Sequence, residues 1–203
     1  MKNDKKEQLL TAALEVFAQK GYLGSSMSDI AEKLGVSKAA LYKHVSGKEE
    51  ILQGILAKMQ QNDTENALAF AMPLEAGGFR RAVDLQAFGE YAKAQFRYWT
   101  EHPFASLFRK MLTLEQFRSK SMAQLYRDSL SVGPCTYVEE IFSASGQSKT
   151  RAHALAVAFY GGMFLYYAAY DAASEKDSVL RDFFTYTDRF LLQLTHGYDF
   201  EKE

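Results

Sequence analysis

The stretch from Ser26 to Lys48 constrains the fold most, because it holds two short helical patterns separated by one glycine. Ser26 followed three residues later by Asp29 is typical of a capping box, which satisfies free amide groups of a first helical turn. Gly35 can adopt a positive φ and stop this helix, and Ser37 can cap a second one. Two short helices joined in this way predict a helix-turn-helix, whose second helix enters the major groove of DNA.

Long hydrogen-bond donors occupy the outward face of the second helix. Lysine, tyrosine and histidine there suit phosphate oxygens and base edges, while two neighbouring alanines let the backbone approach DNA closely. The lysine that opens the next helix can meet a phosphate together with the free amides of that helix. The DNA-contacting residues that we predict are Ser26, Ser37, Lys38, Ala39, Ala40, Tyr42, Lys43, His44 and Lys48.

This segment resembles the DNA-binding domain of the TetR family of bacterial one-component repressors. The agreement of many residue types at fixed spacing, over about twenty-five positions, makes the pattern specific. Leu34 stands where alanine is frequent and Val45 replaces the usual phenylalanine, but both stay apolar. A plain helical hairpin with solvated lysines is the alternative interpretation. The residues that carry the resemblance are Ile30-Ala31, Gly35-Val36-Ser37, Leu41-Tyr42, His44 and Lys48-Glu49-Glu50-Ile51.

Charge is distributed unevenly along a chain whose net charge is −1. Residues 1–48 hold eight lysines against five acidic residues, so the basic end coincides with the predicted DNA-binding segment. The first arginine is Arg80, so base readout there depends on lysine, tyrosine, serine and histidine. A single cysteine, Cys135, fits a reducing compartment, and no apolar run reaches eighteen residues. We therefore expect a cytoplasmic protein that does not span a membrane.

The fold class expected from composition and periodicity is all-α, since prolines are few and helix-favouring residues are abundant. We predict an amino-terminal three-helix helix-turn-helix domain in residues 1–50. A larger helical ligand-binding and dimerisation domain follows in residues 51–203. Chain breaks are expected at 72–78 and at Gly133-Pro134. Outside the helix-turn-helix, apolar spacing predicts helices over 5–20, 48–70, 79–102, 104–114, 115–131, 137–142, 151–170 and 177–196.

The last two predicted helices are suited to subunit pairing. The first of them, 151–170, is apolar nearly all round and must therefore be covered on every side. Gly161 and Gly162 in its middle cost roughly 1 kcal/mol each relative to alanine, which close approach of another helix can offset. We expect a homodimer in which these two helices form a four-helix bundle with their copies. The TetR resemblance implies the same interface, with half-sites about 34–36 Å apart on a palindromic DNA operator.

The larger domain is rich in aromatic residues and methionines, which can line a pocket for an apolar or planar molecule. The resemblance implies an inducer-binding domain here, whose ligand shifts the helix beginning at Lys48 and weakens operator binding. Filling of an ordinary core is the other interpretation. Inward-turned Arg97, Arg109 or Arg127 would instead favour an acidic ligand. The predicted ligand-contacting residues are Tyr91, Phe96, Trp99, Phe108, Met111, Met122, Tyr126, Tyr160 and Phe164.

An enzyme is the main alternative class, together with a helical dimer module that does not bind DNA. The four histidines, His44, His102, His153 and His196, form no spaced metal pair. Cys135 has no histidine nearby in the sequence, and glycine-rich phosphate loops are absent. We therefore expect no catalytic residues, no metal and no cofactor. The expected partners are a double-stranded DNA operator, a small-molecule inducer and a second copy of the chain.

Overall fold

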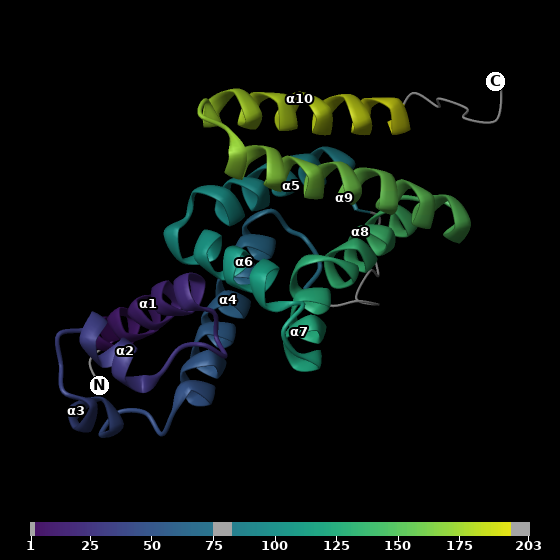
Figure 1. Ribbon diagram of the computed structural model, residues 1–203. Coiled ribbons are helices and arrows are strands. Elements are labelled where there is room, and N and C mark those ends of the chain that lie inside the picture. Colours follow the sequence, from purple (N-terminus) through teal and green to yellow (C-terminus); the bar gives the residue numbers. More distant parts are fainter. Residues whose placement is uncertain (1–2, 75–82, 196–203) are drawn as a thin grey trace. The chain divides into compact units, whose positions relative to one another are not determined.

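The computed structural model describes residues 3–74 and 83–195, with side chains from residue 5 onward. Every regular element in this part of the chain is an α-helix (Figure 1), which confirms the predicted all-α class. The helices are α1 Asn3–Lys20, α2 Met27–Lys33, α3 Lys38–Tyr42, α4 Lys48–Ala69, α5 Leu85–Glu101, α6 Pro103–Glu115, α7 Lys120–Leu130, α8 Val132–Ala144, α9 Lys149–Ala172 and α10 Lys176–Thr195.

The chain divides into two compact units. Unit 1 comprises Met1–Asp63 and Glu101–Leu130, and unit 2 comprises Thr64–Thr100 and Ser131–Glu203. Helix α4 therefore belongs to both, because its first four turns lie in unit 1 and its end lies in unit 2. These are packing units, and the functional division after residue 50 stays a prediction.

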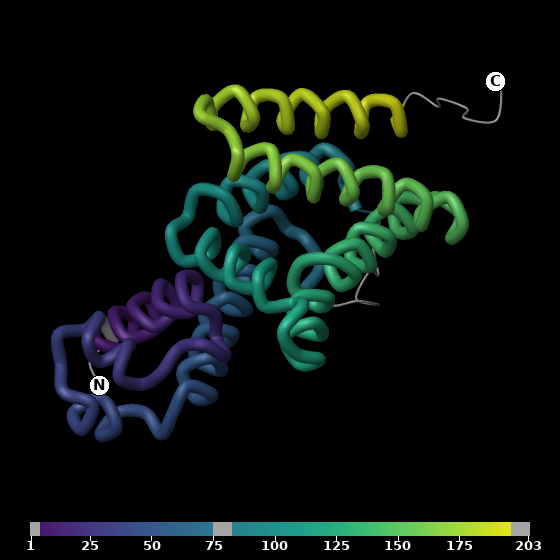
Figure 2. Tube along the Cα trace, in the orientation of Figure 1, coloured from purple at the N-terminus to yellow at the C-terminus, as the bar shows by residue number. Residues whose placement is uncertain are grey.

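In unit 1 the helices α1, α2 and α3 fold beside the first turns of α4 (Figure 2). The apolar stripe of α1 forms the centre of this unit, since Leu14 and Phe17 are fully buried. Ile30 of α2 and Ile51 of α4 are equally buried, so each of these helices is held by apolar side chains at its inner face. Gly21, with φ of 80°, ends α1 as its position in the sequence predicts.

Unit 2 is centred on aromatic rings contributed by α5, α8, α9 and α10. Phe96 of α5 stacks on Phe183 of α10 with ring centroids 4.1 Å apart. Phe88 lies 5.6 Å from Phe142 and 5.3 Å from Phe159, so a second group of rings joins α5 to α8 and α9. Helices α9 and α10 run side by side (Figure 1), joined by a short turn. The aromatic content of the chain thus fills a core in this unit.

Several helix boundaries differ from the sequence prediction, and the helix predicted over 137–142 runs over Val132–Ala144. The helix predicted to begin at residue 79 begins at Leu85, and Val83 and Asp84 are not helical. Residues 79–82, and residues 75–78 of the predicted break, lie outside the described part. The predicted start at residue 115 is also wrong, since residues 116–119 form a turn before α7.

The predicted helix break at Gly133-Pro134 is wrong. The break falls instead at Ser131, whose φ of −129° and ψ of −87° separate α7 from α8. Gly133 and Pro134 lie in the first turn of α8. Proline is tolerated there because the first amides of a helix have no helical acceptor. By contrast, α4 runs without interruption through its polar stretch, as the sequence predicts.

Candidate nucleic-acid interface

The start of α2 has the capping box that the sequence predicts. The Ser26 hydroxyl accepts a hydrogen bond from the Asp29 amide at 3.2 Å, and the Asp29 carboxylate accepts one from the Ser26 amide at 2.7 Å. The Lys20 ammonium also contacts this carboxylate. The ammonium of Lys20, and next the hydroxyl and amide of Ser26, hold the pKa of Asp29 well below its usual range. The carboxylate is therefore charged while it fixes the first turn of α2.

The turn between α2 and α3 depends on Gly35, which has the predicted positive φ of 66°. Backbone amides of the turn donate to carbonyl oxygens at the end of α2, including the Val36 amide to the Ala31 oxygen at 3.0 Å. Ser37 caps α3 as predicted, since its hydroxyl accepts from the Ala40 amide at 3.1 Å. Leu41 is only 2% exposed and fixes the inner side of α3. Both short helices therefore have defined ends and a buried side.

The outer side of α3 is exposed and carries hydrogen-bond donors. Lys38, Tyr42, Lys43 and His44 are all exposed, and the Lys38 ammonium lies 6.0 Å from the centre of the Tyr42 ring. Ala39 is exposed and Ala40 is partly exposed, so the backbone of α3 is open to a close partner. The geometry suits insertion of this face in a groove of DNA. The base and phosphate contacts of these residues stay predictions.

Val36 is a surface residue that our site prediction missed. It lies in the turn just before α3, and 44% of its surface is exposed. An apolar side chain beside the donor-bearing face can contact the methyl group of a thymine. Its place in the Gly-Val-Ser pattern is the only signal in the sequence, and that pattern does not say whether the valine is buried.

Lys48 has a structural role that the sequence does not reveal. Its ammonium donates to the Tyr22 and Ser25 carbonyl oxygens at 2.7 and 2.6 Å, and lies 4.9 Å from the centre of the Tyr22 ring. The Tyr22 hydroxyl donates in turn to the Glu49 carboxylate at 3.0 Å. The loop between α1 and α2 is thereby tied to the first turn of α4. The ammonium keeps a third N–H, so the predicted phosphate contact of Lys48 is compatible with this role.

The predicted ligand-contacting residues divide between the two units. Most are buried, whereas Tyr91 and Tyr126 are partly exposed and Phe164 is 40% exposed. Arg109 is buried, Arg127 is exposed, and the exposed Arg97 lies 5.1 Å over the Phe184 ring. The ligand contacts stay predictions. The residues in unit 1 are Phe108, Met111, Met122 and Tyr126, and those in unit 2 are Tyr91, Phe96, Trp99, Tyr160 and Phe164.

Capped short helices, a glycine turn and an exposed donor-bearing second helix define the class of helix-turn-helix DNA-binding proteins. Residues 9–55 match the model of the bacterial regulatory proteins of the TetR family. This segment is thus similar to the DNA-binding domain of the TetR family, as the residues of its helix-turn-helix indicated.

Sequence relatives are similar over a part of the chain. The chain is 41% identical over 61 residues to the HTH-type transcriptional activator FasR of Mycolicibacterium smegmatis. These residues make up 30% of this chain and 28% of that protein. It is 42% identical over 55 residues to the HTH-type transcriptional regulator SrpR of Pseudomonas putida. These residues make up 27% of this chain and 26% of the relative. These matches thus span less than a third of either relative's length.

Solved structures are similar over nearly the whole chain. A complex of SmeT with triclosan has a TM-score of 0.67 at 14% identity, covering 94% of this chain and 91% of that one. FadR from Bacillus subtilis, in complex with stearoyl-CoA, has a TM-score of 0.63 at 19% identity, covering 95% and 99%. At this level of identity the likeness shows a shared fold and nothing of the ligand.

Proposed function

We propose that this chain is a homodimeric transcriptional repressor. It binds a palindromic operator through α3 and is released by a small apolar or aromatic ligand. The observation that carries the proposal is the exposed face of α3, where Lys38, Tyr42 and Lys43 stand out from a helix with a firmly buried Leu41. Because one five-residue helix contacts few base pairs, two linked copies are needed for useful affinity. A repressor of this kind acts in the cytoplasm of a bacterium, where the DNA is.

The outer face of α9 supports the proposed dimer. Among the described residues, α9 is the one helix whose length and apolar composition would suffice to cross a membrane. Of its most apolar stretch, 39% is buried inside the protein. Its exposed residues repeat at spacings of three and four and so form one stripe. A second copy related by a twofold axis would cover this stripe. It consists of Ala154, Val157, Ala158, Gly161, Phe164, Leu165 and Ala168.

Support for an apolar ligand comes from the aromatic side chains of unit 2 and from the structural relatives. Those relatives were solved with triclosan, an aromatic molecule, and with stearoyl-CoA, which carries a long apolar acyl chain. A ligand that prefers one arrangement of the helices shifts the population of dimers toward it. If that arrangement separates the two α3 helices unsuitably for the operator, DNA is released. The family match is to regulatory proteins, and we assign this chain no catalytic activity.

Selection of binding sites from random double-stranded DNA tests the proposal, because it needs no assumption about the operator sequence. We expect the chain to enrich a palindrome and to bind it in a salt-sensitive manner. Leu165→Glu places a charge in the α9 stripe, so the variant should sediment as a monomer and bind the palindrome at least tenfold more weakly. Leu114→Glu, at another exposed leucine, is the matched control. A wild-type chain that is monomeric, or that selects no site, contradicts the proposal.

A further inference from the structure

The ammonium group of Lys48 is held by the loop between α1 and α2. It donates hydrogen bonds to the Tyr22 and Ser25 carbonyl oxygens, at 2.7 and 2.6 Å, and lies 4.9 Å from the centre of the Tyr22 ring. Both loop residues are buried, so the acceptors are firmly placed. A lysine side chain is flexible, but two hydrogen bonds and the face of a ring together restrict where its ammonium lies.

The Tyr22 side chain is itself held in place. Its ring packs edge-on against the Phe17 ring of α1, with centroids 5.1 Å apart, and its hydroxyl donates to the Glu49 carboxylate at 3.0 Å. The Ser25 hydroxyl donates to the Tyr22 carbonyl oxygen at 2.9 Å and so fixes the backbone of the loop. Burial, and next the Glu49 carboxylate, raise the pKa of Tyr22 to about 12. The hydroxyl therefore keeps its proton and its bond to Glu49 at neutral pH.

The third N–H of the Lys48 ammonium is left for a partner outside the chain. An ammonium has three donors, and within the described residues its hydrogen bonds go to the two loop oxygens. The side chain is partly exposed, so the remaining donor is open to a ligand. Lys48 also begins α4, four residues after the exposed His44 that follows α3. A positive charge is thus fixed beside the surface that we expect to face DNA.

We propose that Tyr22 is a positioning residue for operator binding, whose ring and carbonyl oxygen hold the Lys48 ammonium so that its remaining N–H meets a phosphate group of DNA. Only 8% of Tyr22 is exposed, so it acts through the lysine and not by touching DNA. The inference rests on the operator binding proposed above and assigns the residue that prepares one of its phosphate contacts. Without Tyr22 the lysine keeps its charge but must be ordered on binding, which costs affinity.

A double-mutant cycle on DNA binding separates positioning from general stability. The probe is the palindromic DNA that the wild-type chain selects, and fluorescence anisotropy gives its dissociation constant. Tyr22→Leu should weaken binding about tenfold, because a dimer must then order two lysines. In a Lys48→Met background the same substitution should weaken binding less than about twofold, since no ammonium is left to position. Lys48→Met should also reduce the salt dependence by about two phosphate contacts, one for each protomer.

Tyr22→Met is the second variant if leucine disturbs the fold, because methionine fills irregular space without offering a ring face. Tyr22→Phe keeps the ring and the carbonyl oxygen and should bind within about threefold of wild type. Leu112→Ala, at a fully buried position in α6, is the control for destabilisation and should keep the wild-type affinity.

The outcomes distinguish this inference from the proposed function. Equal losses in the Tyr22 variants with and without Lys48 overturn the positioning role and leave operator binding intact. A loss in Tyr22→Phe as large as that in Tyr22→Leu overturns the role of the ring. Lys48→Met that binds the palindrome like wild type overturns the phosphate contact. A wild-type chain that binds no DNA overturns both the inference and the proposed function.

Discussion

Tyr186 of α10 lies so close to Gly162 of α9 that a Cβ added to this glycine would be 2.3 Å from the tyrosine hydroxyl oxygen. The hydroxyl donates toward the carbonyl oxygens of Ala158 and Phe159, at 2.9 and 3.0 Å. Burial, and next the neighbouring Tyr166 hydroxyl, raise the pKa of Tyr186 to about 12. By contrast, no atom lies within 4 Å of a Cβ built on Gly161. Gly162 therefore faces α10, whereas Gly161 lies on another side of α9, where no atom of the described chain is close.

We expect Gly162→Ala to lower the free energy of unfolding by about 1–3 kcal/mol, because the added methyl group displaces the Tyr186 hydroxyl from α9. Gly161→Ala should be less destabilising than Gly162→Ala, since no atom of the same chain meets the added methyl group and alanine is the better helix former. Urea unfolding at one fixed protein concentration compares the two variants. Equal destabilisation by both would show that Tyr186 does not distinguish the glycines.

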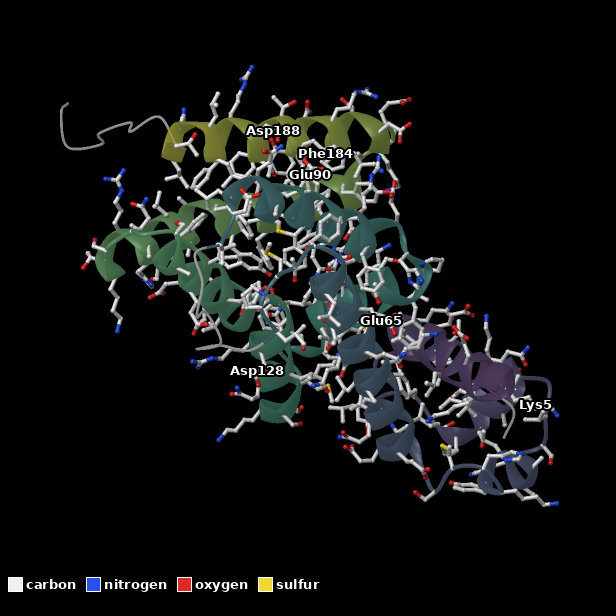
Figure 3. All side chains as sticks on the ribbon, turned by 180° about the vertical axis from the view of Figure 1, so that it is seen from behind. Lys5, Glu65, Glu90, Asp128, Phe184 and Asp188 are labelled. Carbon is white, nitrogen blue, oxygen red and sulfur yellow. The ribbon has the colours of Figure 1, made fainter. Side chains whose placement is uncertain are left out.

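Charged side chains also join α10 to α5. Lys93 bridges the carboxylates of Glu90 and Asp188 at 2.9 and 2.6 Å, and its ammonium lies 5.9 Å from the Phe184 ring. Figure 3 shows Glu90, Phe184 and Asp188 close together on these two helices. Because the carboxylates are largely exposed, this network contributes less than the buried rings beneath it.

Lys48 offers a test of structural against DNA-contacting roles. Lys48→Met should lower the free energy of unfolding by about 1–2 kcal/mol, because its hydrogen bonds to the Tyr22 and Ser25 carbonyl oxygens are lost. Lys43→Met, at an exposed position on α3, should change stability by less than about 0.5 kcal/mol. Both variants should bind DNA more weakly. Unaltered stability of Lys48→Met, measured by urea unfolding, would leave this lysine with a DNA-contacting role alone.

The amino-terminal unit was the more predictable part, because its signals are local. Ser26, Ser37 and Gly35 act within three or four residues of their positions, so their capping and turn roles could be derived from sequence spacing. The partners of Lys48 and Tyr186 are more than twenty residues away, and no periodicity identifies such contacts. Gly161 and Gly162 show what sequence spacing cannot predict. Their presence in mid-helix predicts the close approach of another helix, but which of the two faces α10 depends on packing.

The capping box predicts a pH dependence of the stability of the fold. Since the pKa of Asp29 is held below its ordinary value of 3.8 by Lys20 and Ser26, the charged carboxylate stabilises the folded form. This contribution is fully present above the ordinary pKa and is lost as the pH falls through the lowered one. Thermal unfolding should therefore separate wild type from Asp29→Asn at neutral pH, with the difference shrinking below pH 3.8. The matched control is Glu32→Gln on the exposed side of α2, and a constant difference would contradict the prediction.

An ion pair covers Gly21 at the end of α1. The Arg118 guanidinium donates to Glu115 Oε1 at 2.7 Å, and a Cβ on Gly21 would meet both side chains. The Glu115 side chain is fully buried whereas Arg118 is about half exposed. Arg118→Ala leaves the buried carboxylate without this guanidinium and should lower the free energy of unfolding by about 1–3 kcal/mol.

Replacing both partners of this pair should be less harmful than replacing the arginine alone. Glu115→Met combined with Arg118→Ala removes the buried charge together with its partner, so the double variant should be more stable than Arg118→Ala. Gly21→Ala should also be destabilising, because φ of 80° strains any residue with a Cβ and the methyl group meets the ion pair. Urea unfolding of wild type and these variants compares their free energies of unfolding. A double variant no more stable than Arg118→Ala would mean that the buried carboxylate has another source of stabilisation.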